Sequence, residues 1–104
     1  MKQLVVINNN QIVVSSKDIA EHFGKQHKHV LEIIREILVA ENSATKFFKE
    51  TSSVYRGQEF PFYLMNRDGF SLLAMGFTGK KALQWKLKYI EAFNEMEETL
   101  KQGY

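Results

Sequence analysis

The amino-acid sequence predicts a small α+β domain in which two β-hairpins pack with a helix-turn-helix-like pair and a long C-terminal helix. The 104 residues are 44% hydrophobic and 25% charged, which is the composition of one ordinary globular domain. Two segments have the pattern of paired short strands around a turn, and four segments have helix signals. Because strands and helices alternate in pairs along the chain, we expect one compact domain over residues 1–104.

The chain begins with two short apolar segments that predict a β-hairpin. LVVI at 4–7 and IVVS at 12–15 are rich in β-branched residues, and the asparagine-rich NNNQ between them favours a tight turn. Ser15, with Asp18 three residues later, has the spacing of a capping box. This spacing predicts that a helix begins directly after the second strand.

A short helix and a longer helix are predicted next, separated by a tight turn. Ile19, Ala20 and Phe23 would line one face of the first helix, and Gly24 would end it in a left-handed conformation. The following apolar residues have the spacing of a buried helix face that runs to about Ala40. These residues are Val30, Ile33, Ile34, Ile37 and Leu38.

A polar connector and a second hairpin follow. ENSATKFFKETSS at 41–53 is expected to be a connector that Phe47 and Phe48 hold against the core. VYR at 54–56 and EFPFYLM at 59–65 would be the strands of the hairpin. Pro61 lacks a backbone N–H, so we expect its part of the strand to be an edge or a bulge.

Two helices complete the predicted fold. Asn66 is expected to cap a short helix that Gly76 interrupts, and Thr78 to cap a long helix from Gly79 to about Lys101. The long helix carries two apolar rows, which make a wider apolar surface than one small core usually needs. The first row, which we expect to be the dimer interface, is Trp85, Tyr89, Phe93 and Met96, and the second row is Leu83, Leu87 and Ile90.

Composition limits the class of protein. The chain has no cysteine, which excludes disulfides and thiolate metal sites. No apolar segment is long enough to cross a bilayer, and MKQLVVINNN at the start is too short and too polar for a signal peptide. We therefore expect a cytoplasmic protein without a membrane partner.

The basic residues are clustered, although the net charge is only +2. Residues 17–35 contain four lysines or arginines and all three histidines, against three acids, and residues 67–88 contain five lysines or arginines against one acid. Residues 91–98 contain four acids and no basic residue. A nearly neutral domain with such clusters can still present a basic face to a polyanion.

The segment DIAEHFGKQHKHV at 18–30 is typical of a helix–turn–helix that binds double-stranded DNA. In that interpretation the segment from about 17 to 39 would place its second helix in the major groove. A packed helical corner whose charges face water has the same pattern, and this alternative stays open. The candidate DNA contacts are Lys17, Lys25, Gln26, His27, Lys28, His29, Arg35, Lys80 and Lys81.

Other chemistries find little support in the sequence. His27 and His29 could supply two metal ligands, but no cysteine or suitably spaced carboxylate completes a site, so we expect no metal. GFTGKK at 76–81 lacks the spacing and the Ser or Thr of a phosphate-binding loop. No nucleophile motif is present either, and we expect neither an enzyme nor a cofactor.

Two long motifs resemble the phage regulatory protein Rha family. They are SSKDIAEHFGKQHKHVLEIIREI at 15–37 and YLMNRDGFSLLAMGFTGKKAL at 63–83, and the resemblance extends from Val13 to Glu97. The positions that match the family's motifs are Gly24, Lys25, His27, Val30, Arg67, Asp68, Gly69, Phe70, the segment 76–81, Phe93 and Asn94. The family defines no site whose role can be carried over to these residues.

The resemblance implies a prophage-encoded transcription regulator in a bacterial host cell. We expect it to bind double-stranded DNA as a homodimer, because a two-fold axis would match a palindromic site. The alternative is an antirepressor-like module that binds a repressor or a host protein without touching DNA. Since the chain stops at Tyr104, where related proteins often continue, it is either a fragment or a short version.

Overall fold

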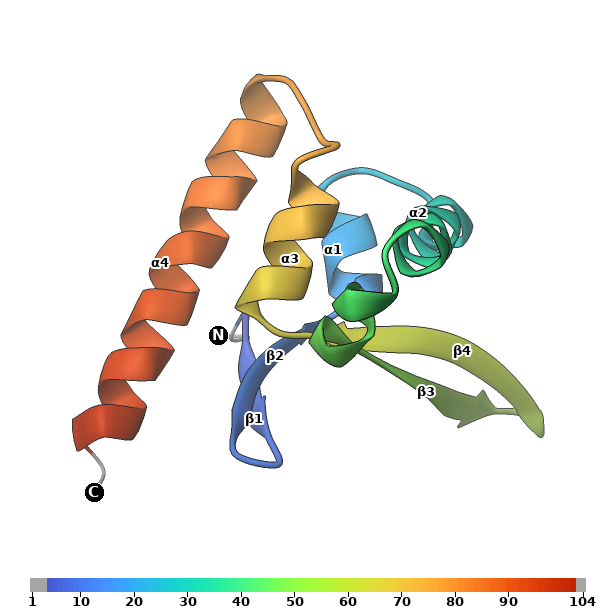
Figure 1. Ribbon diagram of the computed structural model, residues 1–104, viewed down its shortest axis with the longest axis horizontal. Coiled ribbons are helices and arrows are strands. Elements are labelled where there is room, and N and C mark those ends of the chain that lie inside the picture. Colours follow the sequence, from blue (N-terminus) through green and yellow to red (C-terminus); the bar gives the residue numbers. More distant parts are fainter. Residues whose placement is uncertain (1–3, 103–104) are drawn as a thin grey trace.

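The computed structural model describes residues 4–102, which form a four-stranded antiparallel sheet and helices packed on it (Figure 1). The expected α+β domain is thereby confirmed. In chain order the elements are β1 (Val6–Asn8), β2 (Gln11–Ser15), α1 (Ser16–His22), α2 (His27–Ala40), the 3-10 helix η1 (Asn42–Phe47), β3 (Phe48–Tyr55), β4 (Gln58–Met65), α3 (Arg67–Ala74) and α4 (Lys80–Gln102).

The sheet has the strand order β1-β2-β4-β3. Asn9 and Asn10, with φ of 51° and 65°, form the turn between β1 and β2, so the first predicted hairpin is confirmed. Among residues 4–102, the two hairpins of the sheet are joined only through the pairs Val14–Met65 and Ser15–Leu64. Helices α1, α2 and α3 lie on one side of the sheet, and α4 runs along α3 (Figure 1).

The predicted helix–turn–helix-like pair is present. The Ser15 hydroxyl accepts a hydrogen bond from the Asp18 backbone N–H at 3.2 Å, which confirms the predicted cap of α1. Gly24 has a φ of +68°, a conformation that disfavours any side chain with a Cβ, and it ends α1 as expected. Two residues, Lys25 and Gln26, separate it from the start of α2 at His27.

The second hairpin is longer than the sequence predicts. Residues 41–53 are not a connector throughout: η1 occupies the first part, and β3 begins at Phe48. This strand pairs with β4 over its whole length, from Phe48–Met65 to Tyr55–Gln58. Its polar residues have a weak intrinsic preference for a strand, so the pairing with β4 stabilises it.

Pro61 lies at a free edge, as expected. The Tyr63 backbone N–H donates to the Ser16 hydroxyl at 3.0 Å and so points away from β3. Alternate residues of a strand direct their N–H groups to the same side, so the missing N–H of Pro61 also falls on the edge that no strand covers. The strand therefore needs no bulge there, and its register with β3 is continuous.

The last two helices follow the predicted order with one correction. Asn66 accepts a hydrogen bond from the Gly69 backbone N–H at 3.0 Å, which confirms the predicted cap of α3. Thr78 was expected to cap the long helix, but α4 begins at Lys80 and the preceding residue is Gly79. Gly79 has a φ of +101°, and its carbonyl accepts from the Leu83 N–H, so it occupies the capping position instead.

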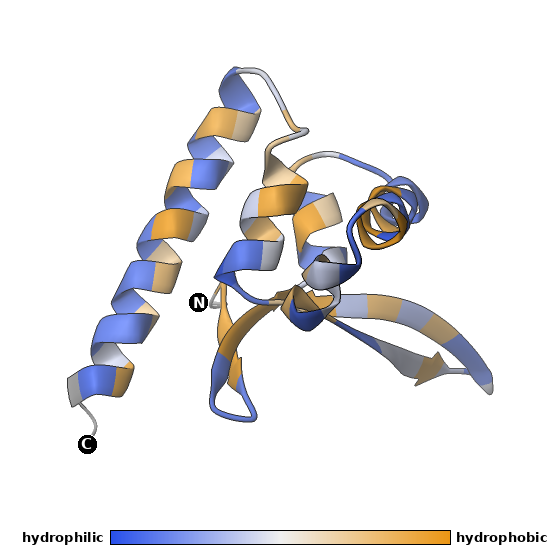
Figure 2. Ribbon diagram, in the orientation of Figure 1, coloured by the Kyte–Doolittle hydropathy of each residue, from blue (hydrophilic) through white to orange (hydrophobic). Residues whose placement is uncertain are grey.

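The core determines which side of α4 is buried. Tyr89 and Phe93 are 0% and 1% exposed and pack in the core of their own chain, with Trp85 and Met96 half-buried beside them. The aromatic row that we expected to pair two protomers is therefore covered within the domain, because α1 and α3 supply the rings that surround it. Figure 2 shows that hydrophobic bands nevertheless recur along the visible side of α4.

Within residues 4–102, no helix is long and apolar enough to cross a membrane.

Candidate nucleic-acid interface

The turn between α1 and α2 leaves the N-terminal end of α2 open to solvent. The Gln26 carbonyl accepts from the N–H groups of His29 and Val30, but the Gln26 side chain makes no capping hydrogen bond. The first turn of α2 also contains no acidic residue. The positive end of the helix dipole and its N–H groups are therefore available to an anion.

Two lysines flank this end of α2, and a third approaches the turn that precedes it. Lys25 and Lys28 are exposed in the turn and in the first turn of the helix. Lys81, from the start of α4, reaches the same corner: its Nζ lies 3.7 Å from the position that a Cβ on Gly24 would take. Together with the exposed side chains of Gln26 and His29, these lysines form what we call the α2 corner.

The buried ring of Phe77 packs next to the α2 corner. It is 2% exposed, lies 4.9 Å from the ring of Phe23, and has the Lys25 Nζ 5.6 Å from its centroid. The segment between α3 and α4 is thereby fixed against the end of α1. This packing explains why residues far apart in the sequence bring their charges to one place.

Two other predicted contacts lie along the second hairpin instead. Lys17 donates from its Nζ to the Ser53 hydroxyl at 2.9 Å and lies over the Phe62 ring. The Arg35 guanidinium lies at the hydroxyl of Tyr63, whose pKa is raised mainly by burial and by Glu50 and is lowered by Arg35. Because side chains alternate along β3 and β4, Lys17 and Arg35 hold opposite faces of the hairpin.

The remaining surface of α2 is mixed in charge. Beyond the first turn, its solvent side exposes Glu32, Glu36 and Val39, together with Arg35. Lys80 is exposed at the start of α4, beside Lys81. Apart from Arg35, the basic residues of α2 thus lie at its N-terminal end.

His27 is partly buried, and its ring contacts α1. Its Nε2 lies 2.9 Å from the Ser16 Oγ, in hydrogen-bonding contact, and Ser16 is fully buried. Burial, and secondly the charge of Lys17, lower the pKa of His27 below its ordinary value of 6.5. The neutral imidazole is therefore the form that the fold favours.

Acid is expected to destabilise the domain through His27. As pH falls through 6.5, the unfolded chain takes up a proton that folded His27 resists, so the free energy of unfolding decreases. Urea unfolding between about pH 7.5 and about pH 5 measures this effect. In His27→Gln the decrease should be smaller than in the wild type, while exposed His29→Gln should keep the wild-type decrease. An unchanged pH dependence in His27→Gln would contradict the assignment.

His22 connects α1 with α4. Its Nδ1 lies 2.6 Å from the Tyr89 hydroxyl oxygen, and its ring stacks on Trp85 with 4.1 Å between the ring centroids. Two of the three histidines thus contact residues of the core. In the part of the chain that the structure describes, no three His, Cys, Asp or Glu side chains gather as metal ligands.

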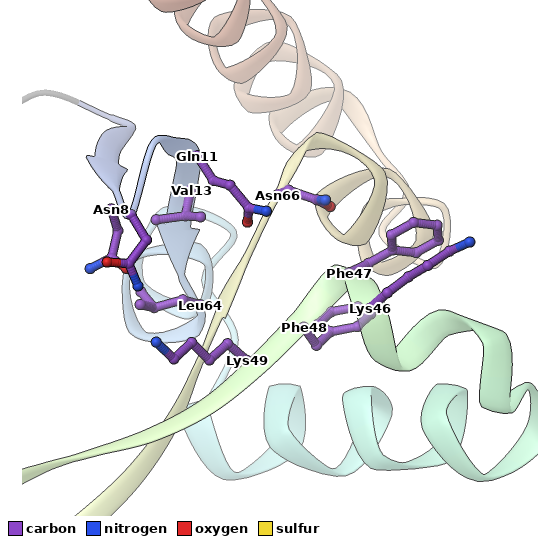
Figure 3. A pocket seen from close by; sticks show the side chains of 10 residues that line it. Asn8, Gln11, Val13, Lys46, Phe47, Phe48, Lys49, Leu64 and Asn66 are labelled. Atoms are coloured by element: carbon purple, nitrogen blue, oxygen red, sulfur yellow. The ribbon is translucent and has the colours of Figure 1, made fainter.

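A shallow hollow lies elsewhere, between the first hairpin and the start of β3 (Figure 3). Polar groups from both hairpins line it, and the lysines at its rim, Lys46 and Lys49, direct their ammonium groups to different sides. Without converging charges, the hollow has the character of a surface groove and not of an anion site.

The outer part of the second hairpin was predicted as a hairpin but not as part of the candidate site. Its turn is formed by Arg56 and Gly57, and Val54, Tyr55 and Phe60 nearby are 68%, 62% and 44% exposed. The Arg56 guanidinium lies 5.2 Å from the Tyr55 ring centroid. A signal was present, since an arginine and a glycine lie between two aromatic residues, but without β3 this segment could not be placed beside α2.

These observations define a small α+β domain built on a helix-turn-helix-like pair, with a basic corner and an adjoining β-hairpin. Residues 14–98 match the family model of the phage regulatory protein Rha, and the chain belongs to this family.

Three relatives cover nearly all of the chain. A protein of Haemophilus influenzae is 39% identical over 99% of the chain, and a 22.8 kDa protein from the gp15–gp3 intergenic region of Salmonella phage P22 is 34% identical over 96%. The SPbeta prophage-derived "putative antirepressor protein YoqD" of Bacillus subtilis is 32% identical over 93%. The chain spans 63%, 52% and 41% of their respective lengths. No solved structure matches.

Proposed function

We propose that this domain is a non-enzymatic transcription regulator that binds double-stranded DNA with the N-terminal end of α2. The observation that carries the proposal is the α2 corner, where Lys25 and Lys28 flank an uncapped helix end and Lys81 reaches the preceding turn at Gly24. A helix end with free N–H groups binds a phosphate, and nearby lysines add the charge that dominates affinity for DNA.

In the α2 corner, some residues would contact phosphates and others would contact the edges of bases. The lysines bind phosphates and set the orientation of the helix on the duplex. Gln26 and His29 are exposed at the start of α2, where the first residues of a recognition helix reach base edges, and a glutamine amide pairs with an adenine edge. Arg35 has a structural role instead, because it joins α2 to the second hairpin at Tyr63.

The second hairpin offers an additional contact beside α2. Lys17 and Arg35 contact it on its two faces, so side-chain contacts join it to the helix pair. Its turn ends in Arg56, which is exposed. With α2 in the major groove, Arg56 is the residue of this hairpin that would contact the neighbouring backbone.

Removing the lysines of the corner is expected to weaken DNA binding about 100-fold at roughly 0.1 M salt, because three phosphate contacts are lost. We would titrate labelled duplex DNA with wild type and with Lys25→Ala/Lys28→Ala/Lys81→Ala, following fluorescence anisotropy at several salt concentrations. The slope of log affinity against log salt should be shallower by about three in the variant.

The matched control removes three lysines from other elements, in Lys46→Ala/Lys49→Ala/Lys101→Ala. It has the same net charge as the first variant, so a general effect of charge would weaken both variants equally. Equal losses, or no salt-dependent binding by a folded wild type, would refute the proposal.

An antirepressor that binds a protein is the second candidate, favoured by the name of the Bacillus subtilis relative. The apolar side chains near the tip of the second hairpin, Val54, Tyr55 and Phe60, would then contact a repressor or a host factor. In that case DNA binding would be absent at low salt, and Tyr55→Ala would weaken the protein complex while the lysine variants would not.

A further inference from the structure

The solvent side of α4 carries an apolar stripe that the domain does not use. Leu83, Leu87 and Ile90 are 57%, 51% and 43% exposed. Their spacing of four and three residues places them on one line along the helix. The buried residues Tyr89 and Phe93 lie on a different side of the helix, turned by about 110° from the stripe, so most of the stripe is left outside the core of the chain.

This stripe has the pattern of a two-helix interface. Continued in both directions with alternating steps of three and four residues, it begins at Lys80 and passes through Asn94 to Glu97. Such a repeat keeps one seam of side chains facing a partner helix. A helix that packed only on its own domain would need just one apolar row, the buried row that contains Tyr89 and Phe93.

The charges along α4 select the partner. Its N-terminal half carries Lys80, Lys81, Lys86 and Lys88 without an acid, and its C-terminal half from 91 to 98 carries four acids without a base. A second copy of the same helix, placed antiparallel, would set each basic half against an acidic half. A parallel copy would set like charges together.

We infer that two copies of this chain pair through antiparallel α4 helices, with the stripe of each copy buried against the other. In the central layer Leu87 lies opposite Ile90 of the second copy. The same register places Leu83 opposite Asn94, and Lys80 opposite Glu97, which also pairs with Arg67 in its own chain. This pairing does not depend on the proposed DNA binding.

The first test measures mass against concentration by sedimentation equilibrium. Wild type should pass from monomer to dimer, and Leu87→Glu should weaken dimerisation roughly 10- to 100-fold, because a buried leucine becomes a charge. The matched control is Val39→Glu, which places the same charge on the exposed side of α2, where Val39 is 87% exposed. Circular dichroism verifies that both variants fold.

The second test fixes the direction of the pair, and the absence of cysteine from the chain makes it simple. In an antiparallel pair, Leu83→Cys of one copy lies next to Asn94→Cys of the other. A mixture of the two single variants, one lengthened by a tag, should therefore form the mixed disulfide under mild oxidation. Each variant alone should form little.

Each outcome decides the inference. A wild type that stays monomeric up to about millimolar concentration overturns it, as does a dimer that Leu87→Glu leaves intact while Val39→Glu disrupts it. Disulfides formed by Leu83→Cys alone would show a parallel pair and overturn the antiparallel register. Since no DNA is present in these tests, they are decided separately from the DNA titration.

Discussion

Replacing Gly69 with alanine is expected to destabilise the domain by about 3 kcal/mol, at the upper end of the usual effect of overpacking. A Cβ at this position would lie 2.7 Å from the Phe47 carbonyl oxygen and 2.9 Å from the Met65 Cβ. Both neighbours are held by the sheet and by η1, so neither can move away as a flexible side chain would. The crowding arises because the first turn of α3 crosses the backbone where η1 passes into β3.

Thermal unfolding followed by circular dichroism measures this effect. For a domain of about 100 residues, the expected loss lowers the Tm by roughly 10 °C or more. Gly76→Ala is the matched control, since the nearest atom to its Cβ is the Leu73 carbonyl oxygen at 3.7 Å, an ordinary contact. Equal Tm values for Gly69→Ala and wild type would contradict the close packing of α3 on this junction.

Truncation of Tyr89 to alanine should have the largest effect on stability, about 3–5 kcal/mol, as for other large aromatic residues in cores. The ring is 0% exposed and lies 5.0 Å from the ring of Phe70 and 6.2 Å from that of Phe23, measured between centroids. It thus joins α4 to both α3 and α1. Without it, α4 loses the contact that holds its middle against the domain.

Tyr89→Phe separates the ring from its hydroxyl. This variant keeps the packing and loses only the contact with His22, so we expect a loss of about 1 kcal/mol. Urea unfolding followed by the fluorescence of Trp85, the only tryptophan of the chain, suits both variants because this ring stacks on His22 beside Tyr89. If Tyr89→Phe destabilised as much as Tyr89→Ala, the hydrogen bond and not the ring would hold α4.

The parts of the fold that the sequence predicts correctly depend on neighbouring residues. The paired asparagines of the first turn, the Ser15 cap and Gly24 act within a few residues, so their chemistry can be recognised without the rest of the molecule. The beginning of β3 was missed for the opposite reason. Its residues are polar, and their partners in β4 are supplied only when the chain folds back at Arg56 and Gly57.

The same distinction applies to the candidate site. Lys25 and Lys28 could be placed near a helix end from the sequence, and the structure adds Lys81 to them from α4. His27 was predicted as a DNA contact, but its ring contacts Ser16, and nothing in the local pattern indicates this partner. On α4 both rows are apolar, so periodicity cannot tell which one faces the core; the positions of α1 and α3 decide it.

Because the two hairpins are joined over a short length, a small rotation at their junction would displace the far end of the second hairpin. Only two residue pairs join β2 to β4, close to Met65, while the turn at Arg56 lies at the far end of β4. At about 3.4 Å per residue the arm is roughly 25 Å long, so a rotation of about 10° at the junction would move the tip by about 4 Å. The α2 corner is fixed to α1 and α4 and would stay in place. Such a rotation would change the distance between the α2 corner and the tip of the second hairpin without changing the corner itself.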